Sequence, residues 1–154
     1  MVAGFHRKFN FGMNLKLEDQ DGENDRELDV VGKDLLRLSK WLKVKAMNRQ
    51  VDGDPRLYRI YHKLEELGEL AIAFGHRDEI EAADALADLQ YLLLGDCVTF
   101  DIPMKDIFAE VHRSNMTKTK EKDDPRMKDR SPESGYSPPD LKTAIEKGRS
   151  RNVR

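Results

Sequence analysis

Two groups of acidic side chains are the residues of this sequence most suited to chemistry. The first group is Glu65, Glu66 and Glu69, and the second is Glu81, Asp84 and Asp88. At about 100° per residue of an α-helix, each group falls within one quadrant of its own helix. Each helix would therefore present a row of carboxylates on one side.

Carboxylates that share one helix face repel one another, and these have few basic neighbours. No Lys or Arg occurs between Ile80 and Cys97. A divalent cation would offset the repulsion, and an oxygen-only ligand set favours Mg²⁺ or Mn²⁺ over zinc. Two solvated helix faces are the alternative, and the spacing alone leaves both readings open.

Two consecutive helices must position these acids. The first, Arg56 to Phe74, carries an apolar stripe; Asp54 is its expected N-cap and Pro55 its first residue. The second runs from Glu79 to about Phe100 after a short turn, in which Gly75 suits a left-handed C-terminal position and Asp78 caps the next helix. We expect an antiparallel hairpin. The expected apolar positions are Leu57, Ile60, Leu64, Leu67, Ala71 and Phe74 on the first helix, and Ala83, Leu86, Leu89, Leu93 and Cys97 on the second.

The remaining elements are also helical in pattern. Helices are predicted within residues 1–14, over 30–48, over 104–115 and over 141–147, with an acidic loop at 17–29. No segment of useful length alternates apolar and polar residues as an antiparallel strand does. The predicted class is all-α.

Length and composition exclude several other classes. The chain has 154 residues, a net charge of -2 and one cysteine, Cys97, so we expect one domain without disulfides or a cysteine zinc cluster. With no strong net charge and no long apolar run, we expect no nucleic acid polymer and no membrane as a partner, and a cytoplasmic location. The charge is nevertheless uneven: residues 1–111 carry a net -7 and residues 112–154 a net +5.

The segments Leu64–Leu70 (LEELGEL) and Asp84–Tyr91 (DALADLQY) resemble the MazG-like, all-α nucleoside triphosphate pyrophosphohydrolases. Three further segments are similar to the phosphoribosyl-ATP-pyrophosphohydrolase-like branch of that superfamily. They are Phe5–Phe9 (FHRKF), Glu110–Lys118 (EVHRSNMTK) and Tyr136–Leu141 (YSPPDL). The resemblance covers residues 56–118 well and the two ends by short motif only.

The resemblance implies a MazG-like helical domain over 1–118, with 17–50 as a probable insertion, and a basic tail over 119–154 that folds over the site. It implies a homodimer or a dimer of dimers. The implied activity is the Mg²⁺-dependent (or Mn²⁺-dependent) hydrolysis of a (d)NTP or related nucleotide to the monophosphate and pyrophosphate.

The resemblance also implies a ligand set. Glu66, Glu69 and Asp88 would bind the metal, with Asp84 as a further ligand, and Glu65 would orient or deprotonate the attacking water. Arg113, Asn115 and Lys118 would contact the substrate's phosphates, although an ion pair between Arg113 and Glu110 is the alternative for that arginine. The sequence departs from the family pattern at Ala85, where the second helix would carry a glutamate. The family pattern on this helix is a Glu followed three residues later by an Asp. Glu81 and Asp84 also have this spacing, but residues 89–94 favour the register in which Asp88 is the aspartate.

Two other functions stay open. A non-catalytic nucleotide-binding or helical interaction protein, with a metal site degraded at Ala85, would keep the fold and lose turnover. An enzyme that acts on phosphoribosyl-ATP would differ only in its substrate. The base and sugar of the substrate cannot be read from the sequence.

Overall fold

The computed structural model describes residues 1–9, 11–47, 54–118 and 135–152. Over these residues it contains six α-helices, one 3₁₀ turn and no strand, which confirms the all-α class. The elements in chain order are α1 (Val2–Phe9), η1 (Leu17–Asp19), α2 (Asp25–Met47), α3 (Pro55–His76), α4 (Glu79–Thr99), α5 (Met104–Thr117) and α6 (Leu141–Asn152). None of the described helices is long and apolar enough to cross a membrane.

The chain forms two compact units. The core unit is Leu15–Asp96, which contains η1, α2, α3 and nearly all of α4. The terminal unit combines Met1–Asn14 with Cys97–Arg154 and contains α1, α5 and α6. All of the predicted acidic residues lie in the core unit, whereas the expected phosphate ligands on α5 lie in the terminal unit.

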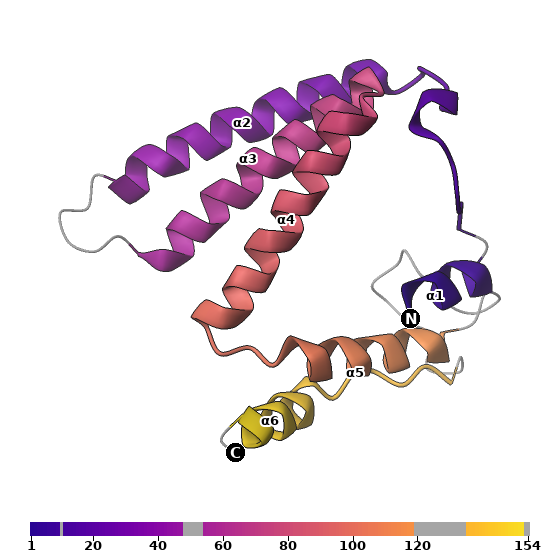
Figure 1. Ribbon diagram of the computed structural model, residues 1–154, viewed down its shortest axis with the longest axis vertical. Helices are drawn as coiled ribbons and strands as arrows, with labels where there is room; N and C mark the ends of the chain where they lie inside the picture. The colour runs from indigo at the N-terminus through magenta and orange to yellow at the C-terminus, as the bar shows by residue number, and fades with distance from the viewer. Residues whose placement is uncertain (10, 48–53, 119–134, 153–154) are drawn as a thin grey trace. The chain divides into compact units, whose positions relative to one another are not determined.

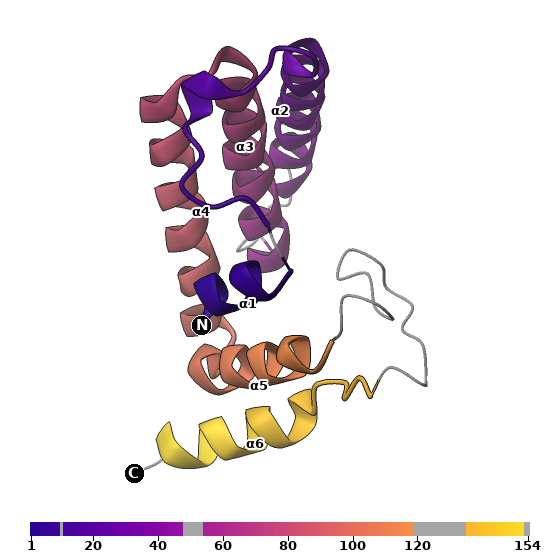
Figure 2. The same ribbon diagram turned by 90° about the vertical axis from the view of Figure 1, so that its right-hand side faces the viewer.

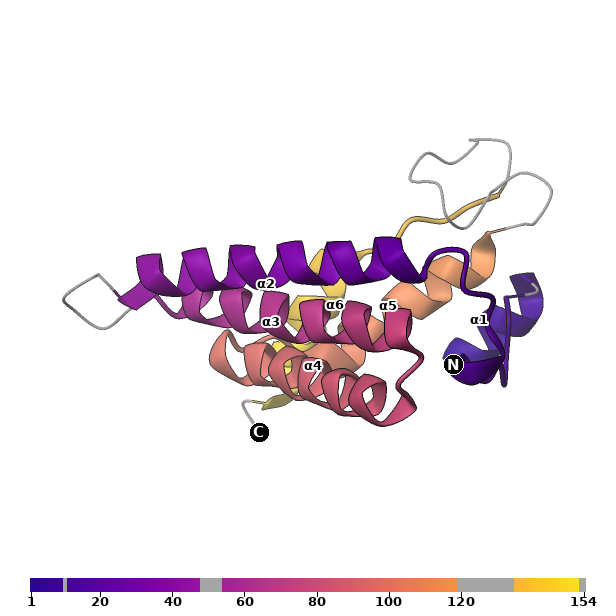
Figure 3. The same ribbon diagram turned by 90° about the horizontal axis from the view of Figure 1, so that it is seen from above.

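Buried residues at seven-residue intervals, most of them small, join α2 to α3, which lie antiparallel along their length (Figures 1 and 3). The buried residues are Gly32, Ser39 and Ala46 on α2, and Tyr61, Gly68 and Gly75 on the facing side of α3. A seven-residue repeat keeps one stripe of each helix against its partner. Within this stripe Ser39 Oγ donates a hydrogen bond of 2.9 Å to the Tyr61 carbonyl oxygen.

This stripe corrects the role predicted for Gly75. The left-handed residue that ends α3 is Arg77, with φ of 58°, and Gly75 lies inside the helix. A Cβ at Gly75 would lie 2.7 Å from the Asp25 carbonyl oxygen of α2. Gly75 is therefore needed for close approach of two helices, a tertiary requirement that the local turn pattern does not show.

The predicted hairpin of α3 and α4 is present (Figures 1 and 2). Both predicted caps are confirmed, because Asp54 accepts a hydrogen bond from the Arg56 N–H and Asp78 accepts from the Ile80 and Glu81 N–H groups. Pro55 is the first residue of α3, as predicted. Near the connecting turn the two helices share a small core of Leu70, Ala73, Ala82 and Ala85, with Leu17, Phe74 and Leu89 packed against it.

The predicted apolar stripes are only partly correct. Leu67 of α3 and Leu86 and Leu93 of α4 stay 44%, 50% and 54% exposed. The hairpin core uses alanines instead, because small side chains allow the two helices to approach closely. Leu67, Leu86 and Leu93 are left on the outside of the core unit, whereas Phe74 and Leu89 of the predicted stripes pack against the core.

Two helices are longer than their apolar periodicity predicts. α2 begins at Asp25, inside the predicted acidic loop, and α6 extends to Asn152 rather than ending at Lys147. Asp25 and Glu27 occupy the first turn of α2, where negative charge interacts favourably with the helix dipole. Arg149 and Arg151 occupy the last turn of α6, where positive charge does the same.

In the terminal unit, α6 runs back along α5 (Figures 1 and 2). Gly148 of α6 lies so close to Pro103 that a Cβ at position 148 would clash with the Pro103 ring. Phe5 and Phe9 of α1 pack with Phe11 in a cluster of tilted and stacked rings. The predicted short N-terminal helix is confirmed.

Candidate functional site

The seam between α3 and α4 carries three groups of side chains. The apolar layer is Leu70, Ala73, Ala82 and Ala85, near the connecting turn. The acidic layer is Glu65, Glu66 and Glu69 on α3, with Glu81, Asp84 and Asp88 on α4, where Glu81 and Asp84 alternate with Ala82 and Ala85 along the helix. A layer of ion pairs between Asp96 of α4 and the side chains of Arg59 and Lys63 on α3 ends the seam.

The acidic side chains act on one another electrostatically. The pKa of Glu66 is raised to about 7, first by burial and then by the charges of Glu69, Asp88, Glu65 and Asp84, in that order of strength. Burial likewise raises the pKa of Glu69, with contributions from Glu65, Glu81, Asp84 and Asp88. Both helices thus contribute carboxylates to a single electrostatic field.

Glu81 was part of the acidic row seen in the sequence but lay outside the expected ligand set. Among the carboxylate charges that raise the pKa of Glu69, that of Glu81 ranks second to Glu65 and ahead of Asp84 and Asp88. It follows that Glu81 belongs to the same acidic layer as the expected ligands. The absence of any Lys or Arg from Ile80 to Cys97 was the signal that could have included it.

The carboxylates are close enough to interact but are not arranged as a finished metal site. Among the described residues, no group of three or more His, Cys, Asp or Glu side chains is placed so that it could hold a metal ion. The donor chemistry of the layer is nevertheless that of a hard divalent cation, since all its side-chain donors are carboxylate oxygens. A bound cation would have to draw side chains of α3 and α4 together.

Ala85 lies in the apolar layer and not in the acidic one. Its side chain is 2% exposed, among Leu70, Ala73 and Ala82. A carboxylate at this position would be enclosed by apolar side chains, at a high desolvation cost. Position 85, where the family pattern has a glutamate, thus carries an alanine that packs in the core of this chain.

An aromatic group adjoins the acidic layer on α3. His62 lies with its ring centroid 4.6 Å from that of Tyr58, in an edge-on arrangement, and 4.3 Å from that of Tyr61. His62 Nδ1 is 3.7 Å from Glu65 Oε2. The residue expected to activate water, Glu65, therefore has an imidazole beside it.

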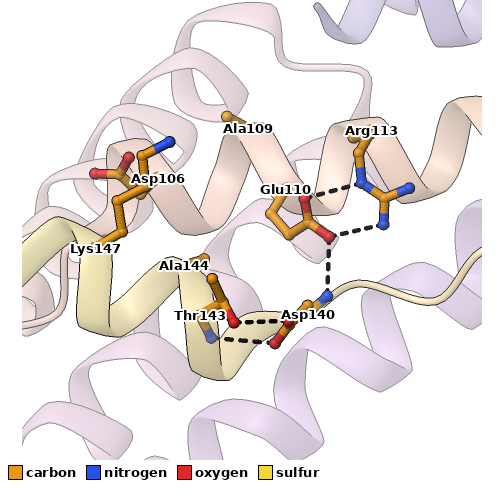
Figure 4. A pocket seen from close by; sticks show the side chains of 8 residues that line it. All are labelled: Asp106, Ala109, Glu110, Arg113, Asp140, Thr143, Ala144 and Lys147. Atoms are coloured by element: carbon orange, nitrogen blue, oxygen red, sulfur yellow. Dashed lines mark hydrogen bonds and ion pairs between the residues drawn. The ribbon is translucent and has the colours of Figure 1, made fainter.

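The expected phosphate ligands on α5 already have partners within the terminal unit. Arg113 forms a two-pronged ion pair with Glu110, with Nη2–Oε1 and Nε–Oε2 distances of 2.7 and 2.9 Å (Figure 4). This is the ion pair that the sequence left open as an alternative. Lys118 Nζ donates to Asn115 Oδ1 at 2.5 Å, and the Lys118 ammonium group lies near the rings of Phe5 and Tyr136.

The described part of the tail is bound to α5. Arg113 donates hydrogen bonds of 3.0 Å to Ser137 Oγ and to the Pro138 carbonyl oxygen. Glu110 accepts a 2.9 Å bond from the Asp140 N–H, and Asp140 caps α6 by accepting from the Thr143 N–H and hydroxyl (Figure 4). The two motifs that looked separate in the sequence, EVHRSNMTK and YSPPDL, thus bind one another. The rest of the predicted lid, residues 119–134, lies outside the described residues.

Beside this contact, α5 and α6 line a cavity of about 400 Å³ (Figure 4). Its walls carry three carboxylates, two basic side chains and small residues, namely Asp106, Glu110, Asp140, Arg113, Lys147, Ala109, Thr143 and Ala144. The polar groups that face it are largely used in holding α6 and the tail to α5.

Comparison with known protein families decides the assignment. Residues 43–115, from the last turn and a half of α2 to the second half of α5, match the family model for phosphoribosyl-ATP pyrophosphohydrolase. Residues 43–115 form a phosphoribosyl-ATP pyrophosphohydrolase domain. This domain is part of the MazG-like all-α superfamily, so the resemblance seen in the sequence is confirmed.

The phosphoribosyl-ATP pyrophosphohydrolase domain contains the whole α3–α4 seam and most of α5. It includes all six carboxylates of the acidic layer, as well as Arg113 and Asn115. Lys118, the YSPPDL motif and residues 25–42 of α2 lie outside the matched residues. The family assignment indicates a hydrolase of the pyrophosphohydrolase type that acts on a nucleotide. No curated protein and no solved structure matches the chain.

Proposed function

We propose that this protein hydrolyses a nucleoside triphosphate or a related nucleotide to the monophosphate and pyrophosphate, with Mg²⁺ or Mn²⁺ as cofactor. The observation that carries the proposal is the shared acidic layer of α3 and α4 inside a phosphoribosyl-ATP pyrophosphohydrolase domain. Such a layer by itself repels an anionic substrate. A divalent cation bound between the layer and the substrate attracts both, so the substrate can bind.

Glu66, Glu69, Asp84 and Asp88 would hold the cation. The pKa of Glu66, raised to about 7 in the absence of a cation, supports this choice, because burial and the repulsion between carboxylates cause the shift and a bound cation would relieve that repulsion. A cation held there supplies Lewis acidity at the phosphoryl oxygens and lowers the pKa of a bound water. The side chains of Glu66 and Glu69 are accessible enough to rotate toward a shared ligand.

Glu65 is the proposed base. The water oxygen bonds to a phosphorus atom beside the α–β bridge, the bridging P–O bond breaks, and its electron pair leaves with the departing phosphate group. Glu65 accepts the proton that the water loses. The neighbouring His62, with Nδ1 3.7 Å from Glu65 Oε2, lies within ion-pair distance of that carboxylate.

Arg113, Asn115 and Lys118 are proposed as phosphate ligands. Each would have to exchange a present partner for a phosphate oxygen, because Arg113 is paired with Glu110 and Lys118 with Asn115. The tail segment that Arg113 holds would then respond to substrate binding. Binding of phosphate by Arg113 would thus be linked to movement of the tail, as a lid requires.

A homodimer is also proposed, built on the apolar side chains that the single chain leaves exposed. On α4, Ile80, Tyr91 and Leu94 are 80%, 79% and 53% exposed and lie on one side of the helix. Exposed apolar groups of this size are typical of surfaces that are covered by a partner. Sedimentation velocity should give a dimer or a dimer of dimers, and Tyr91→Glu should shift the population toward the monomer. A wild-type monomer at micromolar concentration would exclude this proposal.

Pyrophosphate release tests the proposed activity. The substrates are ribo- and deoxyribonucleoside triphosphates and phosphoribosyl-ATP, each with Mg²⁺, with Mn²⁺ or with EDTA. We expect metal-dependent release that falls at least a hundredfold in Glu69→Gln and is unchanged in Glu27→Gln, a matched change at an exposed position of α2. Nucleotide binding without release would instead support the non-catalytic alternative.

A further inference from the structure

A cluster of three charged side chains closes the α3–α4 seam beyond the acidic layer. Asp96 of α4 accepts from Arg59 Nη1 at 3.3 Å and from Lys63 Nζ, both of α3. The three side chains are only 20–23% exposed. Two cations and one anion, together carrying a net positive charge, are thus partly withdrawn from water.

The backbone of α4 is shaped to receive this cluster. A Cβ at Gly95 would lie 2.7 Å from Arg59 Nη1, so the guanidinium lies against the helix where a side chain is missing. Any other residue at position 95 would displace it. The Arg59 guanidinium therefore occupies the space that a side chain at position 95 would take.

The cluster adjoins the acidic layer along both helices. Lys63 precedes Glu66 by one helical turn on α3, and Arg59 precedes Lys63 by another. On α4, Asp96 follows Asp88 by about two turns. The outer phosphates of a nucleotide span about one to two helical turns beyond its α–β bridge. If that bridge lies at the acidic layer, the outer phosphates can therefore reach Lys63 and Arg59 at the end of the seam.

We propose that Lys63 and Arg59, positioned by Asp96, bind the outer phosphates of the substrate, which leave together as pyrophosphate. The inference rests on the proposed function and adds the residues that receive the leaving group. Asp96 is a positioning residue, because it acts through the two cations. Partly buried cations interact with phosphate more strongly than exposed ones do, since water screens the charge less.

A purely structural role for the same cluster makes a different prediction. If Arg59, Lys63 and Asp96 only hold α3 to α4, removing one cation lowers the melting temperature and leaves affinity for phosphates unchanged. If they receive phosphates, removing Lys63 weakens binding of inorganic pyrophosphate. The binding of pyrophosphate thus separates the two roles without relying on turnover.

The experiment compares the full-length wild type with Lys63→Met, Lys63→Arg and the matched control Lys33→Met, which removes an exposed lysine of α2. Calorimetry measures the affinity for inorganic pyrophosphate with Mn²⁺, and kinetics measure KM and kcat for the best substrate. We expect Lys63→Met to lose at least tenfold in pyrophosphate affinity and to raise KM similarly. Lys63→Arg should restore most of both, and Lys33→Met should match the wild type.

Unchanged pyrophosphate affinity in folded Lys63→Met would overturn the inference, as would a wild type that binds no pyrophosphate. If Lys63→Met fails to fold, Lys63→Gln together with the salt dependence of pyrophosphate binding replaces it. A wild type that binds pyrophosphate in a Lys63-dependent way but releases none from any nucleotide would refute the proposed activity alone. The two failures are therefore distinguishable.

Discussion

Gly32 of α2 and Gly68 of α3 face one another at backbone contact distance. A Cβ at Gly32 would lie 2.6 Å from the Gly68 carbonyl oxygen, and one at Gly68 would lie 2.9 Å from the Gly32 carbonyl oxygen. In both cases the obstacle is main chain, which cannot rotate away as a side chain can. The helix that carries the first acidic group is thus held to α2 through a contact that tolerates no side chain.

Gly68→Ala should therefore destabilise the protein. Alanine favours the helical state over glycine by up to about 1 kcal/mol, but forcing a methyl group between two packed helices costs about 1–3 kcal/mol, which outweighs that gain. Urea unfolding followed by circular dichroism should show a lower midpoint. Gly4→Ala is the matched control, because a Cβ at Gly4 meets nothing within 4 Å; a Gly68→Ala variant as stable as Gly4→Ala would show that α2 and α3 do not pack in this way.

The raised pKa of Glu66 predicts how stability depends on pH. The folded protein holds a proton on Glu66 up to a pKa of about 7, whereas the unfolded chain loses it near 4.5. Stability of the metal-free protein should thus fall as pH rises from about 4.5 through 7. Melting temperatures measured with EDTA from pH 5 to pH 8 test this, and Glu66→Gln should flatten the dependence. Stability that rises over this range, or an unchanged slope in Glu66→Gln, would contradict the assignment.

Mn²⁺ or Mg²⁺ should reverse that trend. A cation that binds only the deprotonated carboxylates stabilises the folded state more at pH 8 than at pH 5.5. The melting temperature at pH 8 should rise with metal concentration and should not rise in Asp88→Asn. Equal metal effects at the two pH values would indicate binding away from the acidic layer.

Ala85→Glu should destabilise the protein rather than complete its metal site. Position 85 is 2% exposed among apolar side chains, so a glutamate would be buried without a partner at a cost of several kcal/mol. Ala87→Glu is the control, since position 87 is exposed on the same helix. Thermal melting of the two variants, with and without Mn²⁺, decides the matter, and a stable Ala85→Glu variant with tighter metal binding would show that α4 can rotate in the seam.

Arg113→Lys should release the tail from α5. A lysine keeps the positive charge but cannot make the two-pronged pair with Glu110 and also reach Ser137 and Pro138. Hydrogen exchange at the Asp140 N–H should speed up, because the Glu110 carboxylate that accepts from it loses its positioning partner. Arg26→Lys, an exposed change on α2, should leave that exchange unchanged. Equal exchange in Arg113→Lys and the wild type would show that the tail is held by other contacts.

The sequence by itself determined the parts of this protein that depend on local pattern. Helical spacing of apolar residues predicted the helices, and short polar residues at their starts predicted the caps at Asp54 and Asp78, because a helix end is satisfied by its own neighbours. The acidic rows could be read because side chains three and four apart share a helix face. Family motifs in the same rows led to the pyrophosphohydrolase assignment.

Only the tertiary structure decided which faces meet. The stripe of Gly32, Gly68 and Gly75 is invisible to a search for apolar periodicity, since its function is to remove side chains so that two backbones can approach. Ala85 packs in the core, and Asp96 pairs with Arg59 and Lys63, through contacts between residues up to 37 positions apart in the chain. Such contacts depend on the separation and rotation of helices, which no local pattern encodes. For the same reason, the raised pKa of Glu66 emerged only when the carboxylates of α3 and α4 were placed in one seam.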